Sequence, residues 1–132
     1  MKYLLDTQIF IWLDSNSSKL PDEVRDIITN RDNDLFLSLA SIWEIQIKHQ
    51  LGKLKLQIPL EDLVTSQQNN GVSLLGIQPQ HIYMLSQLPM HHRDPFDRMI
   101  IAQSKFNALN VVSSDKRFRD YDVNVVWPKL SE

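Results

Sequence analysis

Four acidic side chains are the residues of this sequence best suited to chemistry. Asp6 directly follows a short apolar run, and Asp115 follows another such run after two serines. Glu44 lies within a predicted helix, and Asp97 lies near the start of a later one. Buried like charges are costly unless a cation is present. Because the chain has no cysteine and no paired histidine ligands, a cluster of these carboxylates predicts a hard cation, Mg²⁺ or Mn²⁺.

Each of these acids also has a structural interpretation when it is taken alone. The segment 94–97, Asp-Pro-Phe-Asp, is typical of a helix start, where Asp97 stabilises the helix dipole by roughly 0.3 to 1 kcal/mol. Glu44 has Lys48 four residues on, a helix-surface pair that contributes about 0.2 to 0.5 kcal/mol. Asp115 can start a turn. The functional interpretation therefore depends on the acids acting as a group.

The elements that must position the acids alternate along the chain. Apolar runs predict strands, and helical spacing with Pro, Gly and Asn boundaries predicts the segments between them. The predicted strands are 1–7, 35–37, 72–75, 111–115 and 123–127, and the predicted helices are 7–13, 21–31, 38–51, 59–68, 78–88 and 95–108. This alternation predicts a single α/β domain over residues 1–132, a three-layer α/β/α sandwich with a mainly parallel sheet.

The helix 38–51 has an apolar arc that we expect to face the core, with Glu44 at its edge. The arc consists of Leu39, Ala40, Trp43, Ile47 and Leu51.

Ligands bind at the carboxyl ends of parallel strands, where we expect both Asp6 and Asp115. A helix from Asp94 that crosses back toward the 111–115 strand is expected to begin at the opposite edge. That placement would separate Asp97 from the other acids. The conflict disappears if Asp97 lies about one turn into the helix, or if the helix starts at the same edge as Asp6.

Composition and charge exclude several classes of protein. With 42% hydrophobic and 23% charged residues, the 132-residue chain is typical of a globular domain. The absence of cysteine excludes thiolate catalysis and cysteine zinc sites. The net charge of −2 provides no overall basic field, so any contact with nucleic acid must be local. No apolar run approaches the roughly 18 residues that span a bilayer. We expect a cytoplasmic protein without membrane contact.

Four segments share one family resemblance. They are Leu4-Leu5-Asp6-Thr7, Ser41-Ile42-Trp43-Glu44-Ile45, the long stretch 91–103 around Asp94-Pro95-Phe96-Asp97, and Ser114-Asp115. Together they resemble PIN-domain ribonucleases, specifically the VapC-type toxins of type II toxin–antitoxin systems. The stretch around Asp94 is the most specific of the four. One departure is Gln8, where many relatives carry a histidine after the Asp-Thr pair.

The resemblance implies a fold, a site and a reaction. It implies that Asp6, Glu44, Asp97 and Asp115 are catalytic and converge on Mg²⁺, for which Mn²⁺ can substitute, with Asp6 and Asp97 as the metal ligands. The metal would generate hydroxide for in-line attack on an RNA phosphodiester. Supporting roles are expected for Thr7, Ser114 and Asp94, and contacts to RNA for His92, Arg93 and Lys48.

The resemblance also implies two protein partners, a cognate antitoxin and a second copy of the chain. An acidic pocket suits an inhibitor that presents an Arg or Lys to the carboxylates. We expect the apolar side chains of Ile9, Trp12 and Trp43 to form its docking groove.

Three other interpretations stay open at this point. The chain could be a stand-alone PIN nuclease without an antitoxin. It could be a Mg²⁺-dependent receiver-like phosphoacceptor in which Asp6 is one of several strand-end acids, although no convincing lysine ends a late strand. It could also be a non-catalytic PIN-like scaffold, which predicts the loss of acids that are all present here.

Overall fold

The centre of the molecule is a five-stranded parallel sheet. The structure is a computed structural model that describes residues 1–91 and 93–128. Its strands are β1 (Lys2–Leu5), β2 (Asp34–Ser38), β3 (Val72–Leu75), β4 (Asn110–Val112) and β5 (Val125–Val126). They stand in the order β3-β2-β1-β4-β5, and every neighbouring pair is parallel. The predicted parallel α/β architecture is confirmed.

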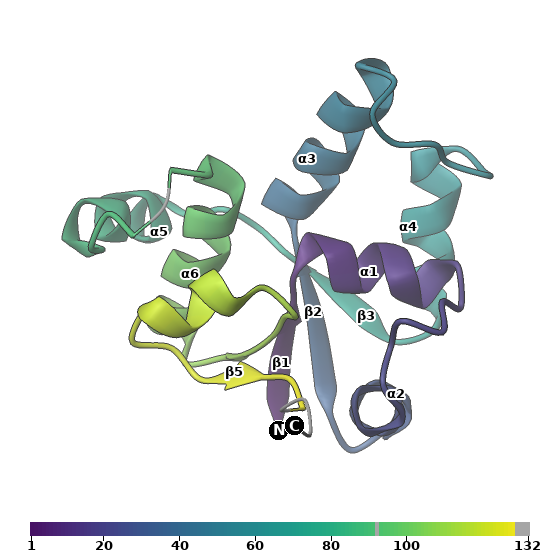
Figure 1. The fold of residues 1–132 in the computed structure, drawn as a ribbon, viewed down its shortest axis with the longest axis horizontal. Helices are drawn as coiled ribbons and strands as arrows, with labels where there is room; N and C mark the ends of the chain where they lie inside the picture. Colours follow the sequence, from purple (N-terminus) through teal and green to yellow (C-terminus); the bar gives the residue numbers. More distant parts are fainter. Residues whose placement is uncertain (92, 129–132) are drawn as a thin grey trace.

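Helices cover both faces of this sheet. They are α1 (Thr7–Asp14), α2 (Asp22–Thr29), α3 (Leu39–Gln50), α4 (Leu60–Asn69), α5 (Pro79–Met84) and α6 (Pro95–Asn107), with 3₁₀ helices η1 (Leu85–Gln87) and η2 (Lys116–Asp120). In Figure 1, α1, α2 and α4 lie to one side of the strands, and α5 and α6 lie to the other. The predicted helix 78–88 is divided into α5 and η1, and η2 was not predicted.

Alternation along the strands builds one core on each face. In β1, Tyr3 and Leu5 belong to the core formed with α1, α2 and α4, whereas Leu4 belongs to the core formed with α6. β4 repeats this division, with Val112 in the first core and Val111 in the second. Successive side chains of a strand point to opposite faces, so continuous apolar runs indicate a sheet covered on both sides.

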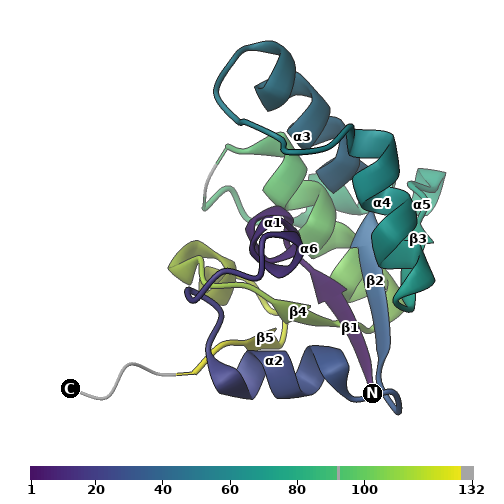
Figure 2. The same cartoon turned by 90° about the vertical axis from the view of Figure 1, so that its right-hand side faces the viewer.

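Helix α3 forms where it is predicted, but the predicted apolar arc is mostly not its buried face. Ser41, Glu44 and Ile45 are buried with Ala40, while Trp43 is 60% exposed and Leu51 is exposed. The physical reason is position: α3 projects beyond the carboxyl ends of the strands (Figures 1 and 2) and packs against α1, α4 and α6. Its inner face therefore carries the Glu44 carboxylate, and its apolar arc faces outward.

Within residues 1–91 and 93–128, every helix falls short of the length and apolar character needed to cross a bilayer.

Candidate active site

The strand order reverses direction between β1 and β4, and this is where the candidate site lies. From β1 the chain builds β2 and β3 on one side, then returns to add β4 and β5 on the other. The loops after two such adjacent strands leave in opposite directions, which opens a crevice at the carboxyl edge. Asp6 directly follows β1, whose arrowhead in Figure 2 is directed at the start of α1. Ser113, Ser114 and Asp115 follow β4.

One pocket of about 310 Å³ brings the predicted acids together. It is lined by Asp6, Thr7, Gln8, Ile11, Glu44, Lys48, Asp94, Asp97, Ser114, Asp115 and Arg117. Of the two placements considered for α6, the opposite edge is wrong, and the start at the same edge as Asp6 is the one that the structure shows. Helix α6 leads into β4 and runs antiparallel to it, and such a helix begins at the edge where the parallel strands end. Asp94 and Asp97, at the start of α6, therefore reach the same edge as Asp6.

Asp6 is held by the start of α1 and by β4. Its Oδ1 accepts a hydrogen bond from the Ile9 amide at 2.8 Å, which caps α1, and its Oδ2 accepts one from the Ser113 hydroxyl. The residue is only 5% exposed. Burial raises the pKa of Asp6 to about 6, against the lowering effect of these two hydrogen bonds. Repulsion from Asp115 and Glu44 contributes to the same rise.

Glu44 reaches the pocket from the inner face of α3. Its Oε1 accepts a hydrogen bond from the Thr7 hydroxyl at 2.6 Å, and its Oε2 lies 2.6 Å from Lys48 Nζ. The hydroxyls of Thr7 and Ser41 lie 2.9 Å apart. The predicted pair with Lys48 is present, but Glu44 is buried rather than on the helix surface. This hydrogen bond to Glu44 also raises the pKa of Lys48.

The first turn of α6 carries two acids with different tasks. Asp94 caps the helix, because its Oδ1 accepts the amides of Phe96 at 2.9 Å and of Asp97 at 3.1 Å. The prediction that the segment 94–97 starts a helix is confirmed. Burial raises the pKa of Asp97 to about 7, and repulsion from Asp94 and then Glu44 adds to the effect. Asp97, like Asp6, thus lies in surroundings that disfavour its charged form.

Asp115 caps η2 and forms an ion pair with the guanidinium of Arg117. Its Oδ1 accepts the Arg117 amide at 2.9 Å, and its Oδ2 lies 2.8 Å from Arg117 Nη2. Sequence reasoning missed Arg117, and also Ser113, whose Oγ additionally accepts the Asp115 amide at 3.0 Å. Ser113 directly follows β4 as Asp6 follows β1, and this shared position is the signal that could have identified it.

The donor set fits a hard divalent cation. Five carboxylates and two cationic side chains line the pocket, formally −3 when all are ionised. Carboxylate oxygens are the ligands that Mg²⁺ and Mn²⁺ prefer, and a divalent charge would relieve the repulsion that raises the pKa values of Asp6 and Asp97. Within 1–91 and 93–128, no three His, Asp or Glu side chains are gathered closely enough to form a ready metal cage. Several of the carboxylate oxygens accept hydrogen bonds from the protein itself, as Asp6 does from the Ile9 amide and Asp115 from the Arg117 amide.

The remaining predicted residues divide into three groups. Thr7, Ser114 and Lys48 line the pocket, as does Gln8. Arg93 is exposed in the loop before α6 and is not among the lining residues. His92 lies outside the described residues.

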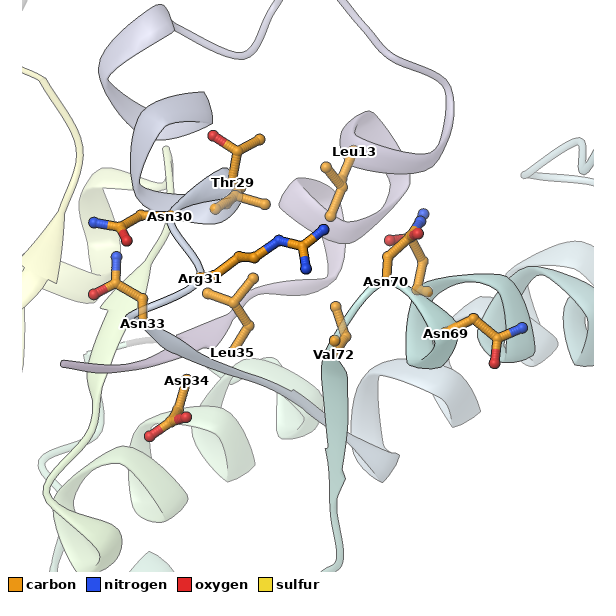
Figure 3. A pocket seen from close by; sticks show the side chains of 13 residues that line it. Leu13, Thr29, Asn30, Arg31, Asn33, Asp34, Leu35, Asn69, Asn70 and Val72 are labelled. Atoms are coloured by element: carbon orange, nitrogen blue, oxygen red, sulfur yellow. The ribbon is translucent and has the colours of Figure 1, made fainter.

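A larger hollow, of about 680 Å³, lies at the other end of the sheet and does not offer the same chemistry. It is formed where α1, α2 and α4 end and β2 and β3 begin. Figure 3 shows Arg31 extending across it between Leu13, Leu35 and Asn70. Its only carboxylate is that of Asp34, which in Figure 3 lies apart from Arg31. With a single acid, this hollow lacks the paired carboxylates found at the carboxyl edge.

Comparisons with known proteins identify the family and the fold of this chain. The PIN domain family matches residues 3–124 of the sequence. The fold is similar to VapBC2 from Rickettsia felis bound to a promoter DNA fragment, with a TM-score of 0.70 and 14% identity over 96% of this chain and 98% of that one. It is also similar to DNA-bound VapBC from Salmonella typhimurium, with a TM-score of 0.69 and 17% identity over 96% and 97%.

A third similar structure is FitAcB from Neisseria gonorrhoeae, with a TM-score of 0.60 and 18% identity over 93% of this chain and 95% of that one. No curated protein sequence matches.

Proposed function

Because the chain belongs to the PIN domain family, we propose that it is a Mg²⁺-dependent endoribonuclease and the toxin of a type II toxin–antitoxin pair. The observation that supports this most is the single pocket that Asp6, Glu44, Asp97 and Asp115 line at the carboxyl edge. The family match favours a nuclease over a receiver-like phosphoacceptor. The retention of all four acids favours an active enzyme over a scaffold.

In this proposal Asp6 and Asp97 would hold the metal, and Mn²⁺ could replace Mg²⁺. When bound, the metal would supply a water of lowered pKa and positive charge for the phosphate. Asp6 is fixed for its task by the Ile9 amide and the Ser113 hydroxyl. Glu44, held by Thr7 and Lys48, orients the attacking water and accepts its proton. Asp115 completes the acidic wall.

The test of this activity is cleavage of labelled single-stranded RNA in Mg²⁺ and in EDTA. We expect cleavage only with the metal, and Asp6→Asn or Asp97→Asn should lower the rate by at least about 100-fold, the scale of losing one catalytic interaction. Asp34→Asn is the matched control, since Asp34 is exposed at the start of β2, at the far edge of the sheet. Equal cleavage rates for Asp6→Asn and the unmodified protein would contradict the assignment of Asp6 as a catalytic residue. Formation of an acylphosphate would support the receiver-like alternative.

The similar folds occur in VapBC and FitAB complexes, which supports a cognate antitoxin as partner. The expected docking groove needs correction: Ile9 is fully buried, and Trp12 is half-buried with its ring centroid 6.2 Å from that of Trp127. The acidic pocket still suits an inhibitor that presents an Arg or Lys.

Co-expression with the product of the adjacent reading frame, followed by size-exclusion chromatography and the RNA assay, tests this partner. We expect the neighbouring protein to co-purify and to suppress cleavage. If it does neither, the chain is a stand-alone nuclease.

The proposal includes a homodimer that works in the cytoplasm on RNA, each copy contributing one nuclease domain. Trp43 supports the dimer, because it is a large apolar side chain that remains exposed although its ring packs edge-on against Phe96, with the ring centroids 5.3 Å apart. Leu39, also on α3, is 42% exposed. Exposed apolar side chains that cluster on one face are typical of protein interfaces.

A further inference from the structure

The wall of the acid pocket contains a guanidinium group to which the mechanism above gives no role. Arg117 belongs to η2, lines the pocket, and has a side chain that is 55% exposed. Its Nη2 lies 2.8 Å from Asp115 Oδ2 and 3.9 Å from Asp97 Oδ2. Its Nε donates to both oxygens of Asp115 at 3.2 Å. The guanidinium is therefore anchored on one acid while it remains accessible from the pocket.

The anchored guanidinium keeps unused donors. Asp115 takes Nε and Nη2, whereas Nη1 makes no hydrogen bond or ion pair with the part of the chain that the structure describes. An arginine has five N–H donors in a rigid fork that matches the oxygens of a phosphate as well as those of a carboxylate. Asp115 thus leaves one end of the fork available for a second anion.

The negative charge of the pocket indicates what the unused Nη1 donors of Arg117 can bind. A phosphodiester that approaches five carboxylates is repelled, and only Lys48 and Arg117 among the lining residues offset that repulsion. Lys48 is held by the buried Glu44 of α3, and Arg117 is held by Asp115, the residue that caps η2 two positions before it. An exposed ion pair contributes only about 0 to 1 kcal/mol to stability. The pair with Asp115 is therefore easily shared with an incoming phosphate.

We propose that Arg117, oriented by Asp115, binds a non-bridging phosphate oxygen of the RNA strand at the cleavage site and so positions the substrate over Asp6 and Asp97. This inference rests on the proposed ribonuclease function. It assigns to Arg117 a contact with the substrate phosphate, and it gives Asp115 the task of orienting the guanidinium.

The experiment compares Arg117→Gln with Arg119→Gln. Arg119 is the matched control because it lies in the same 3₁₀ helix, carries the same charge and donates to the Trp127 carbonyl at 3.1 Å instead of lining the pocket. Binding of a short fluorescent single-stranded RNA is measured by anisotropy in the Asp6→Asn background with Mg²⁺, over a series of KCl concentrations. Cleavage by the single variants and by the unmodified protein is measured in parallel, and melting curves establish that each variant is folded.

For Arg117→Gln we expect Kd to rise about tenfold, the scale of one charge-assisted hydrogen bond. The slope of log Kd against log salt should fall by about 0.7, the value for one phosphate contact on a single strand. Steady-state KM should rise more than kcat falls. Arg119→Gln should leave Kd and slope close to the reference. Arg117→Lys should restore the slope but only part of the affinity, because an ammonium cannot form the fork.

Two results would overturn the inference. If Arg117→Gln binds RNA with the same Kd and slope as Arg119→Gln while its kcat falls, Arg117 only supports Asp115. If the unmodified protein neither binds nor cleaves RNA, the ribonuclease function fails and this role fails with it. The two failures are distinct, because the first occurs in a protein that cleaves RNA and the second does not.

Discussion

At the scale of single residues, the apo site is held in an electrostatically unfavourable state. Asp97 and Asp6 have pKa values raised to about 7 and about 6, each mainly by burial, and neighbouring carboxylates add repulsion. Folding therefore moves two acids into surroundings that disfavour their charged forms. A bound divalent cation would reverse this, since it binds the charged forms.

Removing the charge of Asp97 should therefore stabilise the metal-free protein. At pH 8 we expect Asp97→Asn to raise the free energy of unfolding by about 1 to 3 kcal/mol, because desolvation and repulsion of the carboxylate are lost. The same variant should lose most of the increase in Tm that Mg²⁺ gives the unmodified protein. Thermal melts with and without Mg²⁺ measure both effects. A Tm indifferent to both the metal and the substitution would contradict a shared site.

The pH dependence follows from the same two acids. Their folded pKa values lie above the ordinary value of 3.8, so the folded state binds protons more tightly than the unfolded state. The free energy of unfolding of the metal-free protein should therefore fall as the pH rises from about 4 to about 7, and then level off. Stabilisation by Mg²⁺ should grow over the same range, because the ligands must be deprotonated. Urea titrations at fixed pH values measure this, and a contribution from these acids that rises with pH would refute it.

At the scale of elements, the residues that begin helices position the acids of the site. Asp6 caps α1, Asp94 caps α6 and Asp115 caps η2, so three of the acids in the pocket are also the residues that begin an element. The two uses are compatible because a carboxylate oxygen that accepts a backbone amide keeps a second lone pair. Ser113 joins two of these caps, since it donates to Asp6 and accepts from the Asp115 amide.

Asp94 allows the capping role to be separated from the charge. Asp94→Ala should lower the free energy of unfolding by about 1 kcal/mol through loss of the cap, while Asp94→Ser, which can cap, should cost only a few tenths. Both variants remove a charge that raises the pKa of Asp97, so both should lower that pKa. Urea denaturation gives the stabilities, and NMR titration of the Asp97 carboxyl gives the pKa. Equal destabilisation by Ala and Ser would show that the cap contributes nothing.

Ser113→Ala tests the bridge between β1 and β4. It leaves Asp6 buried with one hydrogen bond fewer, and we expect a loss of about 1 to 3 kcal/mol in the free energy of unfolding. Because the Ser113 hydroxyl lowers the pKa of Asp6, that pKa should rise in the variant, and Mg²⁺ binding should weaken at pH 6 more than at pH 8. Ser114→Ala is the control, since Ser114 lines the pocket but makes no hydrogen bond to Asp6 within the described residues.

At the scale of the whole molecule, the outward apolar face of α3 predicts an oligomer. If Trp43 lies at an interface between two copies, Trp43→Ser should shift the protein from dimer to monomer at micromolar concentration while the melting curve stays cooperative. Sedimentation velocity measures the mass, and Tyr83→Ser is the control, because Tyr83 is 69% exposed on α5. A monomeric unmodified protein, or a dimer unaffected by Trp43→Ser, would contradict this arrangement.

The sequence by itself predicted the alternation of strands and helices and the parallel sheet, and its family resemblance pointed to the four acids that line one pocket. These are local properties: apolar runs such as Tyr3-Leu4-Leu5 are continuous because both faces of the sheet are covered, and Asp94-Pro95 is a cap with a fixed geometry. Asp6 and Asp115 could be placed at one edge because parallel strands end together.

Only the tertiary structure decided which face of α3 is inward and at which edge of the sheet the start of α6 lies. Both depend on how the helix lies relative to the sheet. The spacing of apolar residues along the helix does not specify that placement. The apolar arc with Trp43 matches a buried face, yet the projection of α3 beyond the strands turns Glu44 inward and Trp43 outward. Likewise, the approach of Arg117 Nη2 to within 3.9 Å of Asp97 Oδ2 joins η2 to α6, and contacts between separate elements form only when the chain folds.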